Sequence, residues 1–221
     1  TDIFRNEYLS PRSPYTTLQI PKQGIGEWCH PLHTVDINDA GLRSSVQNGI
    51  LNTELGIPFR TPAEGHNVAF TSLWDNYPDS LEIPLKGKAS RAYLLMAGST
   101  NHMQCHIDNG VIRVYYKDGT CDVMFLRNPD NWPPIEHIFF EDGLAFNRHT
   151  PALYRLRLKT GEISNNFGEE LGFPGASREL DGGAAVLLEM PLNPGKKLSH
   201  LVLETLSNDV VIGLMSITLQ R

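Results

Sequence analysis

The stretch VIRVYYKDGTCDVMFL, residues 111–126, constrains the fold of this chain more than any other segment. Two alternating runs flank Asp118-Gly119, a pair typical of a two-residue turn with positive φ angles. Because successive side chains of a strand point to opposite faces, this segment predicts an antiparallel β-hairpin. We therefore expect a sheet built from neighbouring antiparallel strands.

Further strand patterns follow from residue 80 to the end of the chain. Residues 80–85 alternate, and Pro84 on their polar side suits an edge strand, where the missing N–H costs no ladder bond. Residues 91–97, RAYLLMA, are apolar on both faces, as expected of a central strand between two layers. Residues 198–220 indicate two long strands, and Gly213 in the second marks a bulge or a close approach.

The segment YRLRLK, residues 154–159, alternates strictly. We expect its apolar side chains to point inward and its basic ones to lie in water. The first group is Tyr154, Leu156 and Leu158, and the second is Arg155, Arg157 and Lys159.

The first third of the chain is less regular, and we expect one or two helical turns after Asp39, around Leu42 and Val46. Short alternating strands separated by turns predict two antiparallel sheets packed face to face, an all-β sandwich of jelly-roll type. A chain of 221 residues fits one such domain. We expect an N-terminal arm over residues 1–30, packing on a sandwich over residues 31–221.

Charge and composition exclude several classes of partner. The formal net charge is −6 and no basic run occurs, so we expect no nucleic acid partner. No apolar run approaches the roughly 20 residues that span a bilayer, so we expect no membrane span.

Cys29, Cys105 and Cys121 suggest no disulfide framework. Both ends look processed, and we expect a larger parent protein whose export signal is missing or removed.

Two segments, WCHPLH and NHMQCH, cluster cysteine and histidine. Structural zinc sites usually combine two tight ligand pairs at a characteristic separation, whereas these clusters are irregular. We expect loop histidines and part-buried thiols, with no metal and no cofactor. The alternative is a metal-stabilised module, in which His30 or His102 lies beside a cysteine. The residues concerned are Cys29, His30, His33, His102, Cys105 and His106.

All three tryptophans, Trp28, Trp74 and Trp132, lie in polar, turn-rich segments. Sugars stack their C–H faces on indoles and bond to carboxylates, amides and imidazoles, so these loops indicate carbohydrate binding. The same indoles can instead seal the core or form a protein interface. Both interpretations stay open for Trp28 and Trp132, and core packing is favoured for Trp74. The candidate ligand-binding residues are Trp28, His30, Trp74, Asp75, Asn101, Trp132 and Glu136.

The loop NPDNWPPIEH, residues 128–137, combines a tryptophan, paired prolines, a carboxylate and an imidazole. We expect a mixed role for it. The prolines fix the backbone, Trp132 partly covers the core, and Glu136 and His137 are available at the rim.

Residues 67–104, which include DNYPDS, resemble the opening of galactose-binding-like β-sandwich domains. The segments SPYTTLQIPKQGIGEWCHP, GIPFRTP, AGSTNHMQ and NPDNWPPIEH together resemble a bacterial domain family of unknown function. That family occurs in large exported, often glycoside hydrolase-like polypeptides of polysaccharide-degrading bacteria. The chain departs from it at Pro133, where a second tryptophan is commoner, and at His102, where proline is commoner.

This resemblance runs over almost the whole chain and implies three things. They are a galactose-binding-like jelly-roll sandwich, an exported parent protein in the periplasm or at the cell surface, and a glycan context. It supplies no catalytic residue, and we assign none.

Our leading hypothesis is a non-catalytic, carbohydrate-associated β-sandwich module of a larger polysaccharide-degrading protein. Its partners would be a glycan or other domains of the same polypeptide. The alternative is a glycoside hydrolase or lyase, which requires two of the loop carboxylates to converge in one cleft. Those carboxylates are Glu27, Asp75 and Glu136.

Overall fold

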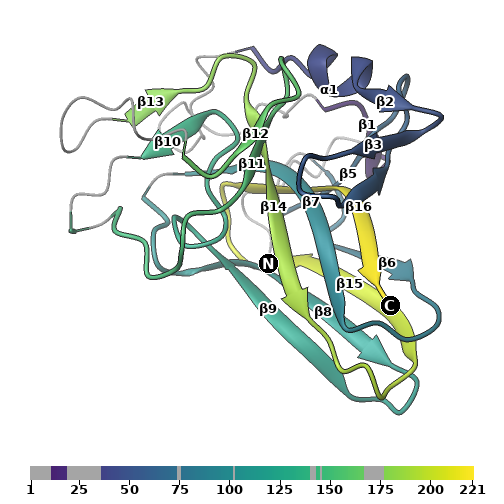
Figure 1. Cartoon of the computed structure of the whole chain (residues 1–221). Helices are drawn as coiled ribbons and strands as arrows, with labels where there is room; N and C mark the ends of the chain where they lie inside the picture. Colours follow the sequence, from purple (N-terminus) through teal and green to yellow (C-terminus); the bar gives the residue numbers. More distant parts are fainter. Residues whose placement is uncertain are drawn as a thin grey trace.

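The computed structural model shows an almost entirely β-stranded chain, with antiparallel sheets packed together (Figure 1). The structure describes residues 11–18, 36–73, 76–101, 103–139, 143–144, 146–166 and 177–221. No helix within these ranges is long and apolar enough to cross a lipid bilayer. The prediction of an all-β sandwich is confirmed.

Two sheets form the sandwich, and every neighbouring pair of strands in them is antiparallel. The seven-stranded sheet has the order β1 (Tyr15–Thr16), β5 (Val68–Ser72), β16 (Val210–Gln220), β7 (Arg91–Thr100), β14 (Ala184–Pro191), β11 (Arg155–Arg157) and β12 (Ile163–Ser164). The four-stranded sheet has the order β6 (Ser80–Pro84), β15 (Leu198–Thr205), β8 (Asp108–Tyr116) and β9 (Cys121–Arg127). Pro84 thus lies on an edge strand, as its missing N–H predicts.

The long strands pair in a nested order. β5 pairs with β16, β6 with β15, β7 with β14, and β8 with β9. The chain therefore pairs like one long hairpin whose turn lies between β8 and β9. Successive pairs of this hairpin belong alternately to the seven-stranded and the four-stranded sheet.

The space between the two sheets is filled by alternate side chains of the long strands. Leu94 and Met96 of β7 are fully buried there, against Ile112 and Val114 of β8. The intervening Leu95 is equally buried but belongs to a second cluster, on the other face of β7. The prediction that residues 91–97 form a central strand between two layers is confirmed.

The predicted hairpin of residues 111–126 is present as β8 and β9, but its turn differs from the prediction. Gly119 has a φ of 86°, and Asp118 is not among the residues with positive φ. The Tyr116 N–H donates to the Thr120 carbonyl across three intervening residues. A loop of this length with glycine in its left-handed position is the next commonest hairpin connection, and the Asp118 side chain closes it by accepting the Thr120 N–H.

Gly213 of β16 marks a close approach, as expected. A Cβ atom there would lie 2.3 Å from the Ala97 carbonyl oxygen and 2.6 Å from the Phe70 ring. The irregularity in the ladder falls just beyond it, between Leu214 and Ser216.

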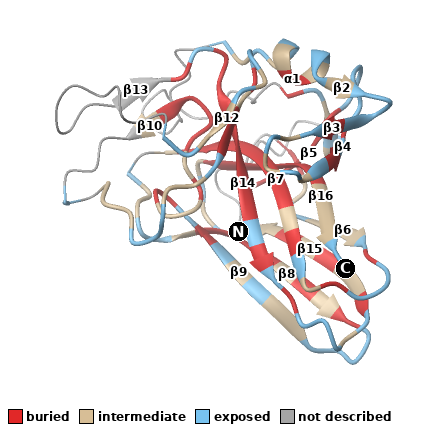
Figure 2. Ribbon diagram, viewed as in Figure 1, coloured by how far each residue is buried: buried red, intermediate tan, exposed pale blue. Residues whose placement is uncertain are grey.

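A third layer covers part of the outer face of the seven-stranded sheet. It consists of α1 (Ala40–Ser44) and a three-stranded sheet of β2 (Val46–Gln47), β3 (Ile50–Asn52) and β4 (Pro58–Arg60). Leu42, Leu51 and Phe59 from this layer are buried against Phe70 and Leu95 of the large sheet (Figure 2). The helix expected around Leu42 is confirmed, whereas Val46 begins a strand.

The arm predicted over residues 1–30 is described only at residues 11–18. There Tyr15 and Thr16 extend the seven-stranded sheet by pairing with Ala69 and Val68. The boundary at residue 30 lies outside the described residues and stays a prediction. A small two-stranded sheet of β10 (His137–Phe139) and β13 (Ser177–Glu179) follows the loop of residues 128–136.

Candidate functional site

Four of the candidate ligand-binding residues lie outside the part of the chain that the structure describes: Trp28, His30, Trp74 and Asp75. Glu27, one of the candidate catalytic acids, lies outside it too. Their roles stay predictions.

Asn101 follows the end of β7 and is half-buried. Its side-chain oxygen accepts the backbone N–H of Met103 at 2.9 Å, and its carbonyl accepts the N–H of Gln104 at 2.9 Å. Both bonds close the turn that leads away from the strand, which is a common use of asparagine. Asn101 therefore shapes a loop at the end of the sandwich.

Trp132 lies wholly inside the core between the sheets. Gly98 of β7 leaves room for its ring, since a Cβ atom there would lie 2.7 Å from the indole. The expectation that Trp132 only partly covers the core is wrong, because no part of the indole reaches the surface. Its burial favours the sealing role over sugar stacking.

Glu136 and His137 do not lie at the rim, and that expectation is wrong as well. Glu136 is fully buried and His137 is 6% exposed. His137 Nδ1 lies 3.5 Å from a Glu136 carboxylate oxygen, and the Ser99 hydroxyl donates to the same oxygen at 3.5 Å. The pair is therefore packed inside the protein.

Arg155 explains how this loop is held. It was expected in water, yet it is buried, and its guanidinium donates to the backbone carbonyls of Pro134, Ile135, His137 and Ala184. Burial lowers the Arg155 pKa to about 10, while the Glu136 charge opposes that shift. The guanidinium thus remains charged at neutral pH and fixes residues 134–137 to β14. Tyr154, expected to point inward, is 39% exposed.

The outer face of the four-stranded sheet carries several ring side chains that are partly exposed. The register pairs Tyr115 with His200 across β8 and β15, on the face opposite the core residues. Their rings are stacked, with centroids 4.7 Å apart and planes 16° from parallel. We call this surface the open face; by register its members are Ser80, Glu82, Pro84, Val111, Arg113, Tyr115, Cys121, Val123, Phe125, Arg127, His200, Val202 and Glu204. Of these, Val111 is fully buried.

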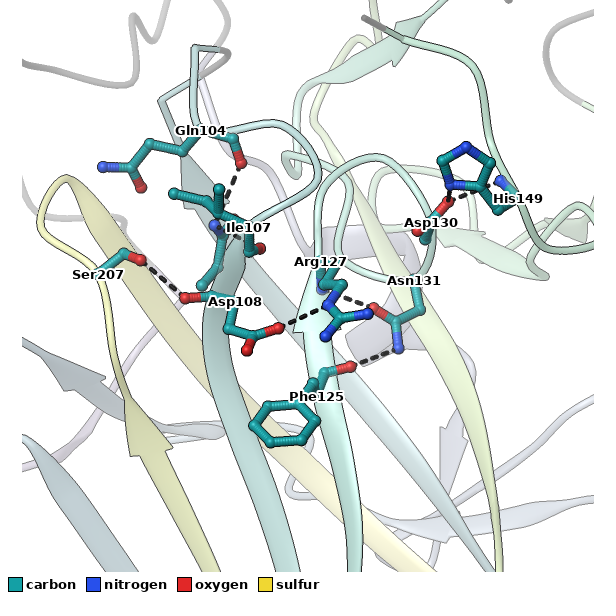
Figure 3. Close-up of polar contacts among 10 residues, drawn as sticks. Gln104, Ile107, Asp108, Phe125, Arg127, Asp130, Asn131, His149 and Ser207 are labelled. Carbon is teal, nitrogen blue, oxygen red and sulfur yellow. Dashed lines mark hydrogen bonds and ion pairs between the residues drawn. The ribbon is translucent and has the colours of Figure 1, made fainter.

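Two apolar side chains stand out on the open face. Val123 and Phe125 of the edge strand β9 are 46% and 40% exposed. The Arg127 guanidinium lies 5.6 Å from the Phe125 ring centroid and is tied to Asp108 at 2.5 Å (Figure 3). The Asp108 contact raises the pKa of Arg127. Phe125 thus presents an aromatic ring beside a guanidinium that an ion pair positions.

Charged and polar side chains of neighbouring strands also pair on the same face. Arg113 of β8 forms an ion pair with Glu204 of β15, and His200 lies 3.9 Å from Glu82 of β6. Rings, guanidinium groups and carboxylates therefore alternate within one surface. The open face can offer stacking and hydrogen bonds to one ligand at the same time.

Sequence reasoning missed this surface because it searched the loops. The available signal was the alternation of residues 111–126, which puts Tyr115 and Phe125 on the side opposite Ile112 and Val114. A second group, formed by His106, Asp130 and His149, also escaped, because its members come from three separate segments.

Comparisons with known proteins add no relative. The chain gives no match to protein-family models, to curated proteins or to solved structures. The fold defines the protein as an all-β sandwich, in which the described residues of one outer face are partly covered by a third layer.

Proposed function

We propose that the protein is a non-catalytic carbohydrate-binding module of an exported polysaccharide-degrading protein, and that glycan lies on the open face. The observation that carries the proposal is the outer face of the four-stranded sheet, where the stacked Tyr115 and His200 and the exposed Phe125 share one rigid surface. Export and the parent protein follow from the family resemblance of the sequence segments.

The chemistry of the face suits a sugar chain. Pyranose rings present apolar C–H faces that pack on aromatic rings, and their hydroxyls bond to charged side chains in fixed positions. Arg113 and Glu204 are positioned by each other, and Arg127 by Asp108. Ordered polar groups lose little rotamer entropy on binding, which favours affinity.

A neighbouring domain of the same polypeptide is the alternative binding partner for this face. The centres of tight protein interfaces are depleted in charge. The open face instead carries Arg113, Glu204, Glu82 and Arg127 among its apolar members. This distribution favours a polar, hydroxyl-rich ligand over a docked protein.

We also infer that the sandwich is a jelly roll. The nested pairs β5–β16, β6–β15, β7–β14 and β8–β9 support this assignment, because a jelly roll is a long hairpin wrapped into two sheets. Galactose-binding-like domains are expected to share the two-sheet arrangement.

The direct test is isothermal titration of the full chain with plant, host and bacterial polysaccharides. We expect binding to at least one class, with Kd values of about 0.1–1 mM, typical of a shallow surface that gains roughly 4–5 kcal/mol. Tyr115→Ala and Phe125→Ala should each weaken binding about tenfold or more, which corresponds to about 1.4 kcal/mol.

The matched control is Tyr15→Ala, which removes a 57% exposed aromatic ring from β1 in the other sheet. Its affinity should equal that of the unmodified chain. Silence across the whole panel would refute glycan binding. Binding that survives both open-face variants would place the ligand elsewhere.

A further inference from the structure

Three connections of the sandwich bring two imidazoles and a carboxylate together at one end of β9. His106 comes from the β7–β8 connection, Asp130 follows β9, and His149 precedes β11. One ligand atom from each, a ring nitrogen or a carboxylate oxygen, lies within 4.8 Å of the other two. Figure 3 shows the Asp130 carboxylate facing the His149 ring.

Backbone bonds hold these three residues in place. The His106 N–H donates to the Asn128 carbonyl at 2.7 Å. The His149 N–H donates to an Asp130 carboxylate oxygen at 2.7 Å, and the Thr150 hydroxyl donates to the Asp130 carbonyl at 2.7 Å. The three segments are therefore linked by hydrogen bonds, and only the two imidazole side chains need to adjust.

The side chains already approach one another. The two imidazole rings have centroids 4.7 Å apart, and His149 Nδ1 lies 3.4 Å from the Asp130 carboxylate. Metal bonds of about 2.0–2.2 Å require donors roughly 3–3.5 Å apart. The donor atoms therefore have to come closer by up to roughly 1.3–1.8 Å, and rotation of the exposed His106 and His149 rings is the movement required.

The donor set selects the kind of ion. Calcium and magnesium prefer sites made only of oxygen ligands, whereas two imidazoles with one carboxylate suit zinc and its first-row neighbours. Such a three-ligand set leaves one coordination position for water or another ligand. The exposure of His106 and His149 gives an ion direct access from solvent.

We propose that His106, Asp130 and His149 bind one divalent first-row transition-metal ion, with Zn²⁺ as the representative. The ion joins the three connections at one end of the sandwich. Of the two cysteine–histidine clusters in the sequence, this site uses only His106, and it replaces the expectation that the protein binds no metal. It goes beyond glycan binding and does not depend on it.

The test is calorimetric titration of the chelator-treated full chain with ZnCl₂, without any glycan. We expect one ion per chain with a Kd at or below about 10 μM, and a higher unfolding temperature in excess Zn²⁺, because only the folded chain presents the site. Titration with Co²⁺ should give the visible absorption of a nitrogen- and oxygen-coordinated ion.

The variants His149→Gln and Asp130→Asn should each weaken Zn²⁺ binding at least tenfold. Asp130→Asn keeps an oxygen that accepts the His149 N–H, so the fold around it is preserved. The matched control is His66→Gln, which alters an exposed histidine outside the group and should bind like the unmodified chain.

Three results would overturn the proposal. The first is no binding up to about 1 mM Zn²⁺. The second is equal Zn²⁺ affinity in Asp130→Asn and the unmodified chain. The third is a loss of affinity in His66→Gln as large as in the site variants. Binding that persists in both site variants assigns the ion to other groups, such as the cysteines. Glycan titration without metal separates failure here from failure of the open-face proposal.

Discussion

The two outer faces of the sandwich differ in how far other parts of the chain cover them. Part of the outer face of the seven-stranded sheet lies under α1 and β2–β4, where contact side chains such as Phe59 and Phe70 are fully buried. The outer face of the four-stranded sheet keeps Val123 and Phe125 in solvent. Figure 2 shows the contrast, with mostly exposed and intermediate residues along β9 and mostly buried ones along β7 and β14.

The difference indicates which face contributes to stability and which face is available for the binding that we propose. An antiparallel sheet needs only one face in the core, so its second face is free for another purpose. Here one second face adds to the core, and the other carries ordered rings and ion pairs. The first three of the following predictions compare a buried or packed position with an exposed one, and the fourth concerns an exposed turn.

The largest effect is expected from Phe59→Ala on the covered face. The side chain is 0% exposed, and removing a buried phenyl ring costs about 3–5 kcal/mol in the free energy of unfolding. Phe125→Ala on the open face should cost roughly 0.5 kcal/mol or less. Urea unfolding of both variants gives the comparison, and similar losses would mean that the open face is covered in solution.

The next largest effect is expected from Arg155→Met. The four carbonyls would lose the guanidinium as a donor, at a cost of roughly 3 kcal/mol, although Pro134 and Ile135 keep the backbone N–H groups of His137 and Ala184. Arg113→Met on the open face removes a partly exposed ion pair with Glu204 and should cost about 0.5 kcal/mol. The same unfolding series measures both, and an Arg155 variant as stable as the Arg113 variant would contradict the buried role.

A smaller effect is expected from Gly41→Ala in α1. Alanine favours a helix by about 1 kcal/mol, but its Cβ would lie 2.3 Å from the Lys159 carbonyl oxygen. The clash should prevail and give a net loss of about 1–2 kcal/mol, because α1 must move off the sheet it covers. Ser44→Ala, at an exposed position of the same helix, is the control and should change stability by less than about 0.5 kcal/mol. A stabilised Gly41 variant would show that α1 is not docked.

The smallest effect concerns pH and the β8–β9 turn. Hydrogen bonds from Thr120 and Lys196 lower the pKa of Asp118 from 3.8 to about 2. A depressed carboxyl pKa stabilises the fold above the unfolded value, and this contribution is lost as pH falls from about 4 toward 2. Asp118→Asn should therefore unfold at a slightly lower temperature at pH 6, and the difference should vanish near pH 2. Thermal unfolding at both pH values tests it, and a difference that grows in acid would contradict it.

Local patterns predicted the strands well, because alternation and turn residues act over a few positions. The strands within residues 111–126 and 91–97 form as expected for that reason, although the turn between β8 and β9 is longer than predicted. The failures involve contacts between distant segments. Arg155 looked like a solvent residue in an alternating strand, and its burial depends on carbonyls some twenty residues earlier in the chain.

The candidate site shows the same limit. Trp132 and Glu136 were chosen for their chemistry in a polar loop, yet packing against β7 and Arg155 buries both. The open face could have been found from the period of the hairpin, since Tyr115 and Phe125 fall on its outer side. The group of His106, Asp130 and His149 required the three-dimensional structure.

Hydroxyl-radical footprinting of the full chain tests the central claim most directly, with and without a polysaccharide from the binding panel. Tyr115 and Phe125 should be oxidised readily in the free protein while Phe59 stays protected, and the polysaccharide should shield both open-face rings. Equal oxidation of Phe59 and Phe125 in the free protein would contradict the covered and open faces. Unchanged oxidation of Tyr115 and Phe125 in the saturated complex would contradict the binding role.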